Sequence, residues 1–197
     1  MKKLTLVFSA LFCLCACNSY TPSPYKAAKD RYEGTYRVIS ISADDNVAYD
    51  LFNCGLSELS LGEQFAENGY FLGNAGITID ETSGSGTATF MFITQRIRAK
   101  GEPPYSMDSP IEEVDAAESY SQRIPLTVQA DMSIRWSKGI IDYKGDESLL
   151  HRTLLGEAEV LFLDGAAMRI HFEQFPIFDY QQAKLLLIPV TYYLERE

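Results

Sequence analysis

The sequence predicts an all-β domain folded as an antiparallel up-and-down β-barrel of about eight strands, with a β-sandwich as the alternative. Apolar and polar residues alternate with a period of two in most segments after residue 33, which is typical of half-buried strands. Glycine- and aspartate-containing turns separate these segments, and helical periodicity is scarce. Closure into a barrel would remove the exposed strand edges that a sandwich keeps.

The chain begins with a segment typical of a secretory signal. Met1-Lys2-Lys3 is basic, and Leu4 to Leu14 is an apolar run too short to cross a bilayer as a helix. The run ends in Leu14-Cys15-Ala16-Cys17, which resembles the lipobox of bacterial lipoproteins. The resemblance implies that Cys17 receives a diacylglycerol, that the chain is cut before it, and that the new amine is acylated, for example with palmitate. The alternative is an ordinary secretory signal with incidental cysteines.

The lipobox resemblance divides the chain into three parts. Residues 1–16 form the signal peptide, residues 17–31 a polar lipidated tether with Pro22 and Pro24, and residues 32–197 the β domain. Cleavage leaves 181 of 197 residues, which is enough for one domain with a core of its own. We therefore expect a single soluble domain on a lipid anchor and no transmembrane helix.

The chain is acidic. Its net charge of −10 becomes −12 once Lys2 and Lys3 leave with the signal. This charge argues against binding nucleic acid or anionic lipid headgroups and suits cationic or neutral partners. The first acidic residue after Cys17 is Asp30. Surface-exposed lipoproteins of the Bacteroidetes type often carry acids just after the anchor, so the resemblance implies the outer membrane, facing the periplasm.

The first strand is expected over Gly34 to Ile41, where Tyr36 and Val38 alternate with polar or outward residues. Gly34-Thr35-Tyr36 resembles the Gly-x-Trp start of lipocalins, with tyrosine in place of tryptophan. The eight-strand order and the ending Tyr192-Tyr193-Leu194-Glu195-Arg196 extend this resemblance. It implies a lipocalin-like barrel in which Arg196 or Arg37 packs over the aromatic residue of the first strand.

The stretch from Asp50 to Gly55 resembles a segment of lipocalin-like Bacteroidetes lipoproteins that reads like half a calcium loop. Calcium needs oxygen ligands at alternating positions, and Phe52 and Cys54 occupy two of these. We therefore predict no metal here, but a turn at residues 53–55 that leads into a short helix. Cys54 has no partner once Cys17 is lipidated, so it is expected to be unpaired and buried as a small apolar residue, a reactive thiol being the alternative.

The remaining elements are short strands joined by turns. Gly76–Asp80 and Gly86–Arg98 are expected to form a hairpin around Ser83–Gly86. Residues 99–118 contain three prolines and four clustered acids, which predict a loop, either a lid or a solvated excursion. The further expected strands are Ser119–Gln129, Ser133–Ile141, Glu157–Leu163, Met168–Phe175 and Lys184–Glu195, with an Asp164-Gly165 turn, bulges or edges at Pro125 and Pro189, and a helical turn near residues 147–152.

The sequence offers little for catalysis. His151 lies in a polar segment and His171 alternates outward beside Glu173, while a Gly-x-Ser-x-Gly elbow, clustered zinc ligands and phosphate-binding loops are missing from the sequence. We therefore expect a protein that is not an enzyme and that needs neither metal nor cofactor.

The aromatic content is more informative. The chain has 12 tyrosines and 11 phenylalanines, which in a small barrel either fill the interior or line a cavity. The predicted ligand-binding residues are those expected to point inward: Phe90, Phe92, Tyr120, Trp136, Ile140 and Phe172. The expected function is the binding of a small apolar or amphipathic ligand in the cell envelope. The alternatives are a dry core and a membrane-anchored accessory subunit that contacts an envelope protein partner.

Overall fold

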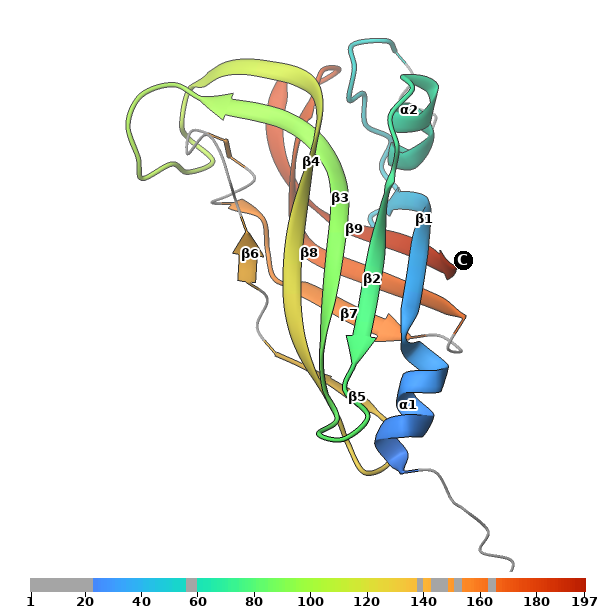
Figure 1. The fold of residues 1–197 in the computed structure, drawn as a ribbon. Helices are drawn as coiled ribbons and strands as arrows, with labels where there is room; N and C mark the ends of the chain where they lie inside the picture. Colours follow the sequence, from blue (N-terminus) through green and yellow to red (C-terminus); the bar gives the residue numbers. More distant parts are fainter. Residues whose placement is uncertain (1–22, 56–59, 138–139, 143–148, 151–153, 163–165) are drawn as a thin grey trace, which may run out of the picture.

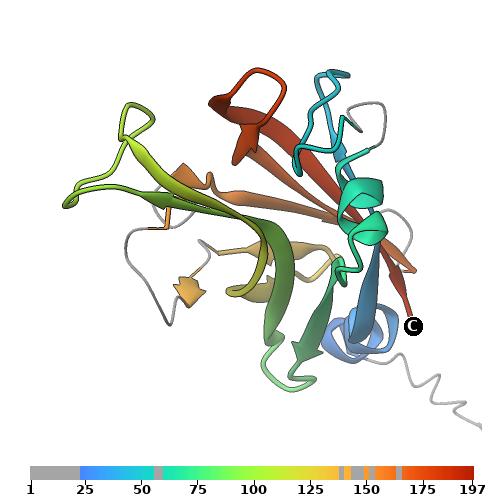
Figure 2. The ribbon, with the colours of Figure 1, turned by 90° about the horizontal axis from the view of Figure 1, so that it is seen from above.

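The computed structural model describes residues 23–55, 60–137, 140–142, 149–150, 154–162 and 166–197. One antiparallel sheet contains all the strands in this part of the chain and curls into a nearly closed barrel (Figures 1 and 2). This confirms the predicted all-β, lipocalin-like barrel and excludes the sandwich alternative, because a sandwich has two sheets. The strands are β1 (Gly34–Ala43), β2 (Gly73–Ile79), β3 (Ser85–Ala99), β4 (Ile111–Val128), β5 (Ile134–Trp136), β6 (Ile140–Asp142), β7 (Ala158–Phe162), β8 (Ala167–Asp179) and β9 (Lys184–Arg196).

The strand order is β5-β4-β3-β2-β1-β9-β8-β7, and β6 also pairs with β4. Apart from β6, each strand therefore pairs with a strand that is next to it in sequence, and the first strand pairs with the last. The β1–β9 pairing begins with Tyr36 opposite Arg196 and continues to Ala43 opposite Val190. In the described residues β7 pairs only with β8, so the barrel has a seam between β7 and the β5–β6 side.

Alternation of side chains places the core inside this wall. On β8, Met168, Ile170 and Phe172 are buried while Arg169 and Glu173 are exposed, as their spacing predicts. A second, smaller apolar cluster lies at the C-terminal end of β3 and contains Ile97, Ala99, Tyr105, Leu150 and Leu185. The barrel body and this end are thus separate packing units.

The helix α1 (Pro24–Tyr32) differs from the expectation of a tether over residues 17–31. Ser23 caps it by accepting a hydrogen bond from the Lys26 N–H, and Pro24 stands in the first turn, where a missing N–H costs nothing. Ala28 and Tyr32 are buried against the core. The folded domain therefore begins at Pro24, and α1 lies at one end of the barrel (Figure 1).

The β2–β3 hairpin turn packs directly on this helix. Gly84 has φ +69°, and a Cβ built there would lie 2.6 Å from the Tyr25 ring. The turn therefore requires glycine for both its backbone angle and its close approach to α1.

The helix α2 (Leu61–Glu67) confirms the predicted short helix, and it lies at the opposite end of the barrel (Figure 1). Ser60 and Glu63 form a capping box, in which each side chain accepts a hydrogen bond from the other residue's N–H. Gly62 lets the helix approach β1, since a Cβ at this position would lie 2.8 Å from the Ile41 nitrogen.

The prediction of a loop over residues 99–118 is wrong for its second half. Strand β4 begins at Ile111 and pairs with β3 along its length. The acids expected to repel one another instead face basic residues across the strand pair: Asp115 forms an ion pair with Arg96, and Glu113 with Arg98. Opposite charges on neighbouring strands therefore stabilise a segment whose own sequence suggests a solvated loop.

The expected strand Ser133–Ile141 is divided into β5 and β6, and Pro125 explains the division. The Pro125 carbonyl accepts a hydrogen bond from the Ser137 N–H. In an antiparallel pair the N–H and C=O of one residue point to the same neighbouring strand, so the N–H that proline lacks is one that would have bonded to this strand. Pro125 thus interrupts the β4 edge between its two partners. Pro189 stands opposite the irregularity in β8 between Phe172 and Phe175, which agrees with the bulge or edge predicted at this proline.

Arg196 lies where the first and last strands pair, opposite Tyr36, and the expected packing of its guanidinium over the Tyr36 ring stays a prediction. Its guanidinium lies over Gly34 and donates hydrogen bonds to the carbonyls of Arg31 and Glu33 at the end of α1. Arg37, the other expected residue, is exposed opposite Glu195. Among the described residues, no helix is long and apolar enough to cross a membrane. The Asp164-Gly165 turn lies outside the described residues, as do most of the expected helical turn near residues 147–152 and its His151.

Candidate functional site

The candidate site is the inner face of the β3–β4 pair, here called the inner wall: Phe90, Phe92 and Thr94 of β3 with Glu118 and Gln122 of β4. The register sets these residues in two neighbouring rows, with Phe90 opposite Gln122 and Thr94 opposite Glu118. The pairing is regular between these two positions, so alternation turns all five side chains to the same side of the sheet. Phe90, Phe92, Thr94 and Gln122 are at most 2% exposed.

The apolar part of the inner wall belongs to an aromatic cluster that crosses the barrel. The Phe92 ring meets Phe172 of β8 edge-on, with centroids 5.1 Å apart, and it meets Tyr192 of β9 at the same distance. Phe90 stacks on Phe92 at 5.8 Å. The Tyr192 hydroxyl donates to the Ile93 carbonyl at 2.7 Å, and its full burial raises its pKa well above the ordinary value.

The polar part of the inner wall lacks partners. The side-chain oxygens Thr94 Oγ1, Glu118 Oε2 and Gln122 Oε1 are buried, and none has a hydrogen-bond partner among the described residues. A buried polar atom without a partner costs about 1–3 kcal/mol, so folded proteins keep few of them. Three such atoms on one face of two paired strands indicate a surface that something else must satisfy.

Trp136 lies at the margin of this wall. Its ring is tilted against Phe90 at 6.5 Å, and the residue is only half-buried because β5 has three residues and lies at the end of the sheet order. The expectation that Trp136 lies inside the barrel is therefore met in part: it packs on the core but remains accessible from one side.

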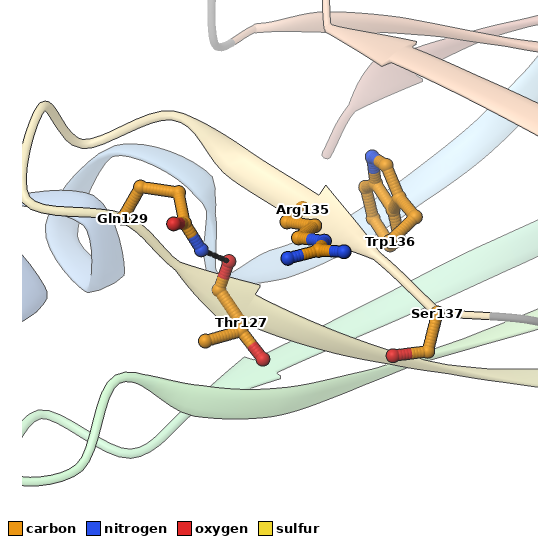
Figure 3. Close-up of a pocket in the computed structure, with 5 residues that line it drawn as sticks. All are labelled: Thr127, Gln129, Arg135, Trp136 and Ser137. Carbon is orange, nitrogen blue, oxygen red and sulfur yellow. Dashed lines mark hydrogen bonds between the residues drawn. The ribbon is translucent and has the colours of Figure 1, made fainter.

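A polar hollow of about 520 Å³ lies beside β5 (Figure 3). Its lining combines Trp136 with polar residues of β4 and β5 and the chain that follows each strand, namely Thr127, Gln129, Arg135 and Ser137. Thr127 and Arg135 are cross-strand partners and both are exposed, so the hollow opens on the outer face. Trp136 is the residue that belongs both to the hollow and to the packing against Phe90.

The structure brings together three of the six residues predicted to bind ligand. Phe90, Phe92 and Phe172 belong to one aromatic cluster, and Trp136 adjoins it. The side chains of Tyr120 and Ile140 lie outside the described part of the structure.

Sequence reasoning missed Thr94 and Glu118 as site residues. The sequence predicts an acidic loop at Glu118 because its neighbours are acids. The alternation that places Gln122 on the inner face nevertheless continues along the same strand to Glu118. That alternation is the signal that could have identified it.

The loop after β1 is organised by Asp50. Its carboxylate accepts hydrogen bonds from the N–H groups of Phe52, Cys54 and Gly55 at 3.2, 3.1 and 2.9 Å. Burial alone would raise the pKa of Asp50, but these backbone donors outweigh burial and lower it. The predicted turn at residues 53–55 is therefore held by a carboxylate that has no need of a metal.

Cys54 differs from its expectation. It is a free thiol, but it is exposed rather than buried as a small apolar residue. The Asp50 carboxylate fixes the backbone of this turn, and among the described residues the Cys54 thiol stays exposed.

His171 belongs to a polar network on the outer face. Its Nδ1 lies 2.9 Å from Asp44 Oδ2, and the Thr191 hydroxyl donates to that same oxygen at 2.6 Å. Nε2 faces Glu173 at 3.4 Å. The Thr191 proton is thus directed to Asp44 and not to the imidazole, so the arrangement links β1, β8 and β9 and does not activate the hydroxyl as a nucleophile.

Within the described ranges, no group of three or more His, Cys, Asp or Glu residues is placed to hold a metal ion. In comparisons with known proteins, no family model, curated protein or solved structure matches the chain. The chemistry of the site must therefore be argued from its own residues.

Proposed function

We propose that the protein is a lipid-anchored envelope protein whose barrel binds a small apolar or amphipathic ligand at the inner wall. Cys17 is the proposed anchor, and the outer membrane facing the periplasm is the proposed location, both from the lipobox resemblance. The observation that carries the binding function is the row of unpartnered polar oxygens on Thr94, Glu118 and Gln122 beside the aromatic cluster.

This combination suits a ligand with two chemical parts. Phe90 and Phe92 are covered by the packed core, so a ligand body would meet the wall at its accessible margin, Trp136, and the polar oxygens offer hydrogen bonds to its head. A purely apolar ligand would leave the oxygens unsatisfied, so the structure favours the amphipathic member of the expected pair. The proposed approach to the wall lies beside β5, where Trp136 is half-buried.

Native mass spectrometry tests the proposal on protein purified without detergent from its own membrane fraction, after release of the acylated N-terminus. We expect a fraction of the protein to carry an additional mass of a few hundred daltons that leaves on gentle activation. Emission from Trp136 should then change when the stripped protein is titrated with an amphiphile. An unliganded mass alone, with emission unmoved by amphiphiles of every head group, would contradict the proposal.

A control separates the inner wall from the outer hollow. Arg135→Gln removes the one cation that the described residues contribute to the hollow's lining, without touching the inner wall. If the ligand binds at the inner wall, this variant should keep its affinity within about twofold. A large loss in this variant alone would move the site to the outer face.

The second candidate is an accessory subunit that contacts an envelope protein partner. It is favoured by β7, which pairs only with β8 among the described residues, and by Leu161 on that strand, which is 43% exposed. Cross-linking in intact cells with a photoreactive residue in place of Leu161 tests it. A specific heterologous adduct would support the candidate, and adducts no more frequent than those from a residue at Thr78, which is also exposed, would count against it.

A further inference from the structure

We propose that the polar hollow beside β5 is a second binding site, which takes an acidic saccharide, a sugar that carries a carboxylate or phosphate group. Arg135 binds the anionic group. The hydroxyls of Thr127 and Ser137 and the amide of Gln129 bind the sugar hydroxyls. This site is independent of the inner wall, because the hollow opens on the other face of the sheet.

The lining of the hollow is polar. Thr127 of β4 and Arg135 of β5 are directly opposite each other and both are exposed, so their side chains leave the outer face together. Gln129 Nε2 donates to the Thr127 carbonyl at 3.4 Å, and the Ser137 N–H donates to a β4 carbonyl at 2.9 Å, so both residues stay beside β4. In Figure 3 the Arg135 side chain extends among these polar groups, whereas the Trp136 ring points away from them. The volume of about 520 Å³ lies within the range of pockets that hold small molecules.

The donors of this lining are available to a ligand. In the described part of the chain the Arg135 guanidinium has no ion-pair or hydrogen-bond partner, and neither have the hydroxyls of Thr127 and Ser137. A guanidinium presents its N–H donors in a planar fork, which matches two oxygens of a carboxylate or phosphate. Hydroxyl and amide side chains both donate and accept, as the hydroxyls of a sugar do. The lining therefore combines one anion-binding group with three groups that suit a hydroxylated body.

The acids of the chain leave this region clear, although the net charge of the whole chain is −10. The parts of β3, β4 and β5 around the hollow contain no aspartate or glutamate; these parts are residues 85–95, 119–130 and 133–137. The Asp131 carboxylate, in the β4–β5 turn, accepts two hydrogen bonds from within its own turn, at 3.0 and 2.6 Å.

The remaining acids of β4 are distant from the hollow. Glu118 comes nine residues before Thr127, which is about 30 Å along the strand at the usual rise per residue. Charges separated by more than about 8 Å are largely screened at physiological ionic strength. The acidic chain therefore repels an anion in the hollow only weakly, while Arg135 attracts it at contact distance.

The experiment compares four ligands that share one sugar ring and differ in charge: glucuronate, glucose 6-phosphate, glucose and glucosamine. The protein is the whole chain as purified from its membrane fraction in a polyoxyethylene detergent, which brings neither sugar nor charge. Binding is measured at pH 7 by calorimetry and, for weak ligands, by saturation-transfer NMR. We expect the two acidic sugars to bind at least tenfold more tightly than glucose, and glucosamine to bind most weakly. Added salt should weaken the acidic sugars and leave glucose unchanged.

Two variants and a matched control locate the effect. Arg135→Gln should weaken glucuronate at least tenfold and keep glucose within threefold, because only the anionic group loses its partner. Thr127→Val keeps a branched side chain on the strand and should weaken all four sugars severalfold. The control Arg123→Gln removes the same charge from an exposed position of the same sheet face, outside the lining, and should leave every affinity unchanged.

Each contrary outcome overturns a defined part of the proposal. Equal binding of glucuronate and glucose, or tightest binding of glucosamine, would overturn the anionic ligand. Inorganic phosphate that binds as tightly as glucose 6-phosphate would overturn the saccharide. Unchanged glucuronate affinity in Arg135→Gln, or an equal loss in Arg123→Gln, would overturn the hollow as the site. Failure of all four sugars to bind would overturn the whole proposal and leave the inner-wall function standing, since that function predicts binding of amphiphiles.

Discussion

Replacing Trp136 with alanine tests how much of the inner wall is core and how much is an accessible margin. A fully buried tryptophan or phenylalanine costs about 3–5 kcal/mol of unfolding free energy when truncated to alanine. Trp136 is only half-buried, on a strand of three residues, and its ring lies 6.5 Å from the Phe90 ring between centroids. We therefore expect a loss of about 1.5–2.5 kcal/mol, roughly half of the full-burial cost.

The measurement is urea denaturation followed by far-ultraviolet circular dichroism, because the variant has lost the only tryptophan of the chain. Phe92→Ala is the comparison at full burial and should cost about 3–5 kcal/mol, since its ring contacts Phe90, Phe172 and Tyr192. Phe71→Ala is the comparison at an exposed position, 53% accessible, and should change the unfolding free energy by less than about 0.5 kcal/mol.

The order of the three costs is the decisive result. A Trp136→Ala loss as large as that of Phe92→Ala would mean that Trp136 lies in the closed core and that the seam offers no approach to the inner wall. A loss as small as that of Phe71→Ala would mean that β5 is not packed on Phe90. Emission of the parent protein should have a maximum between those of buried and solvated tryptophan, and iodide should quench it in part.

Three further predictions concern the anchor, the Asp50 turn and the free thiol. Cys17→Ala should abolish labelling by a clickable fatty acid and release the protein from membranes, whereas Cys15→Ser should leave labelling intact; equal labelling of both variants would end the lipobox interpretation. Asp50→Asn should lower the unfolding free energy at pH 7 by about 1–2 kcal/mol, because a charged acceptor for three N–H groups is lost. Because the pKa of Asp50 is lowered in the folded state, its stabilisation is present above the unfolded pKa of about 3.9 and disappears as the pH falls through the folded pKa. The difference in unfolding free energy between parent and variant should therefore narrow below about pH 4 in denaturation curves. A difference that stays constant with pH would refute the role of the charge. Cys54 should react with a thiol reagent in the folded protein at nearly the rate of a small-molecule thiol, and protection until unfolding would contradict its exposure.

Much of the strand pattern was readable from the sequence because it depends on neighbours within a few residues. Alternation predicted the buried residues Met168, Ile170 and Phe172, and Gly84 predicted the β2–β3 turn, although Gly86, expected in the same turn, lies in β3 opposite Ile79. The pairing of the first strand with the last followed from the predicted up-and-down barrel, and Arg196 lies at that pairing, opposite Tyr36. Period, turn chemistry and family motif are all local signals.

Other features needed the folded chain. Residues 111–118 read as a loop because like charges and prolines are local signals, whereas the arginines that neutralise Asp115 and Glu113 lie on another strand. Pro24 favoured the interpretation of this segment as a tether, although Ser23-Pro24 is also a typical helix start. The burial of Tyr32 in the folded chain shows that the segment is a helix packed on the core.

The two halves of the candidate site also differ in how far the sequence alone predicts them. Its apolar half, Phe90 and Phe92, was visible in the alternation of one strand. Its polar half was not, because a glutamate, a threonine or a glutamine is unremarkable in a sequence until the register shows that its neighbours cannot satisfy it. Whether a buried oxygen has a hydrogen-bond partner depends on atoms brought from distant parts of the chain, so only the tertiary structure decides it.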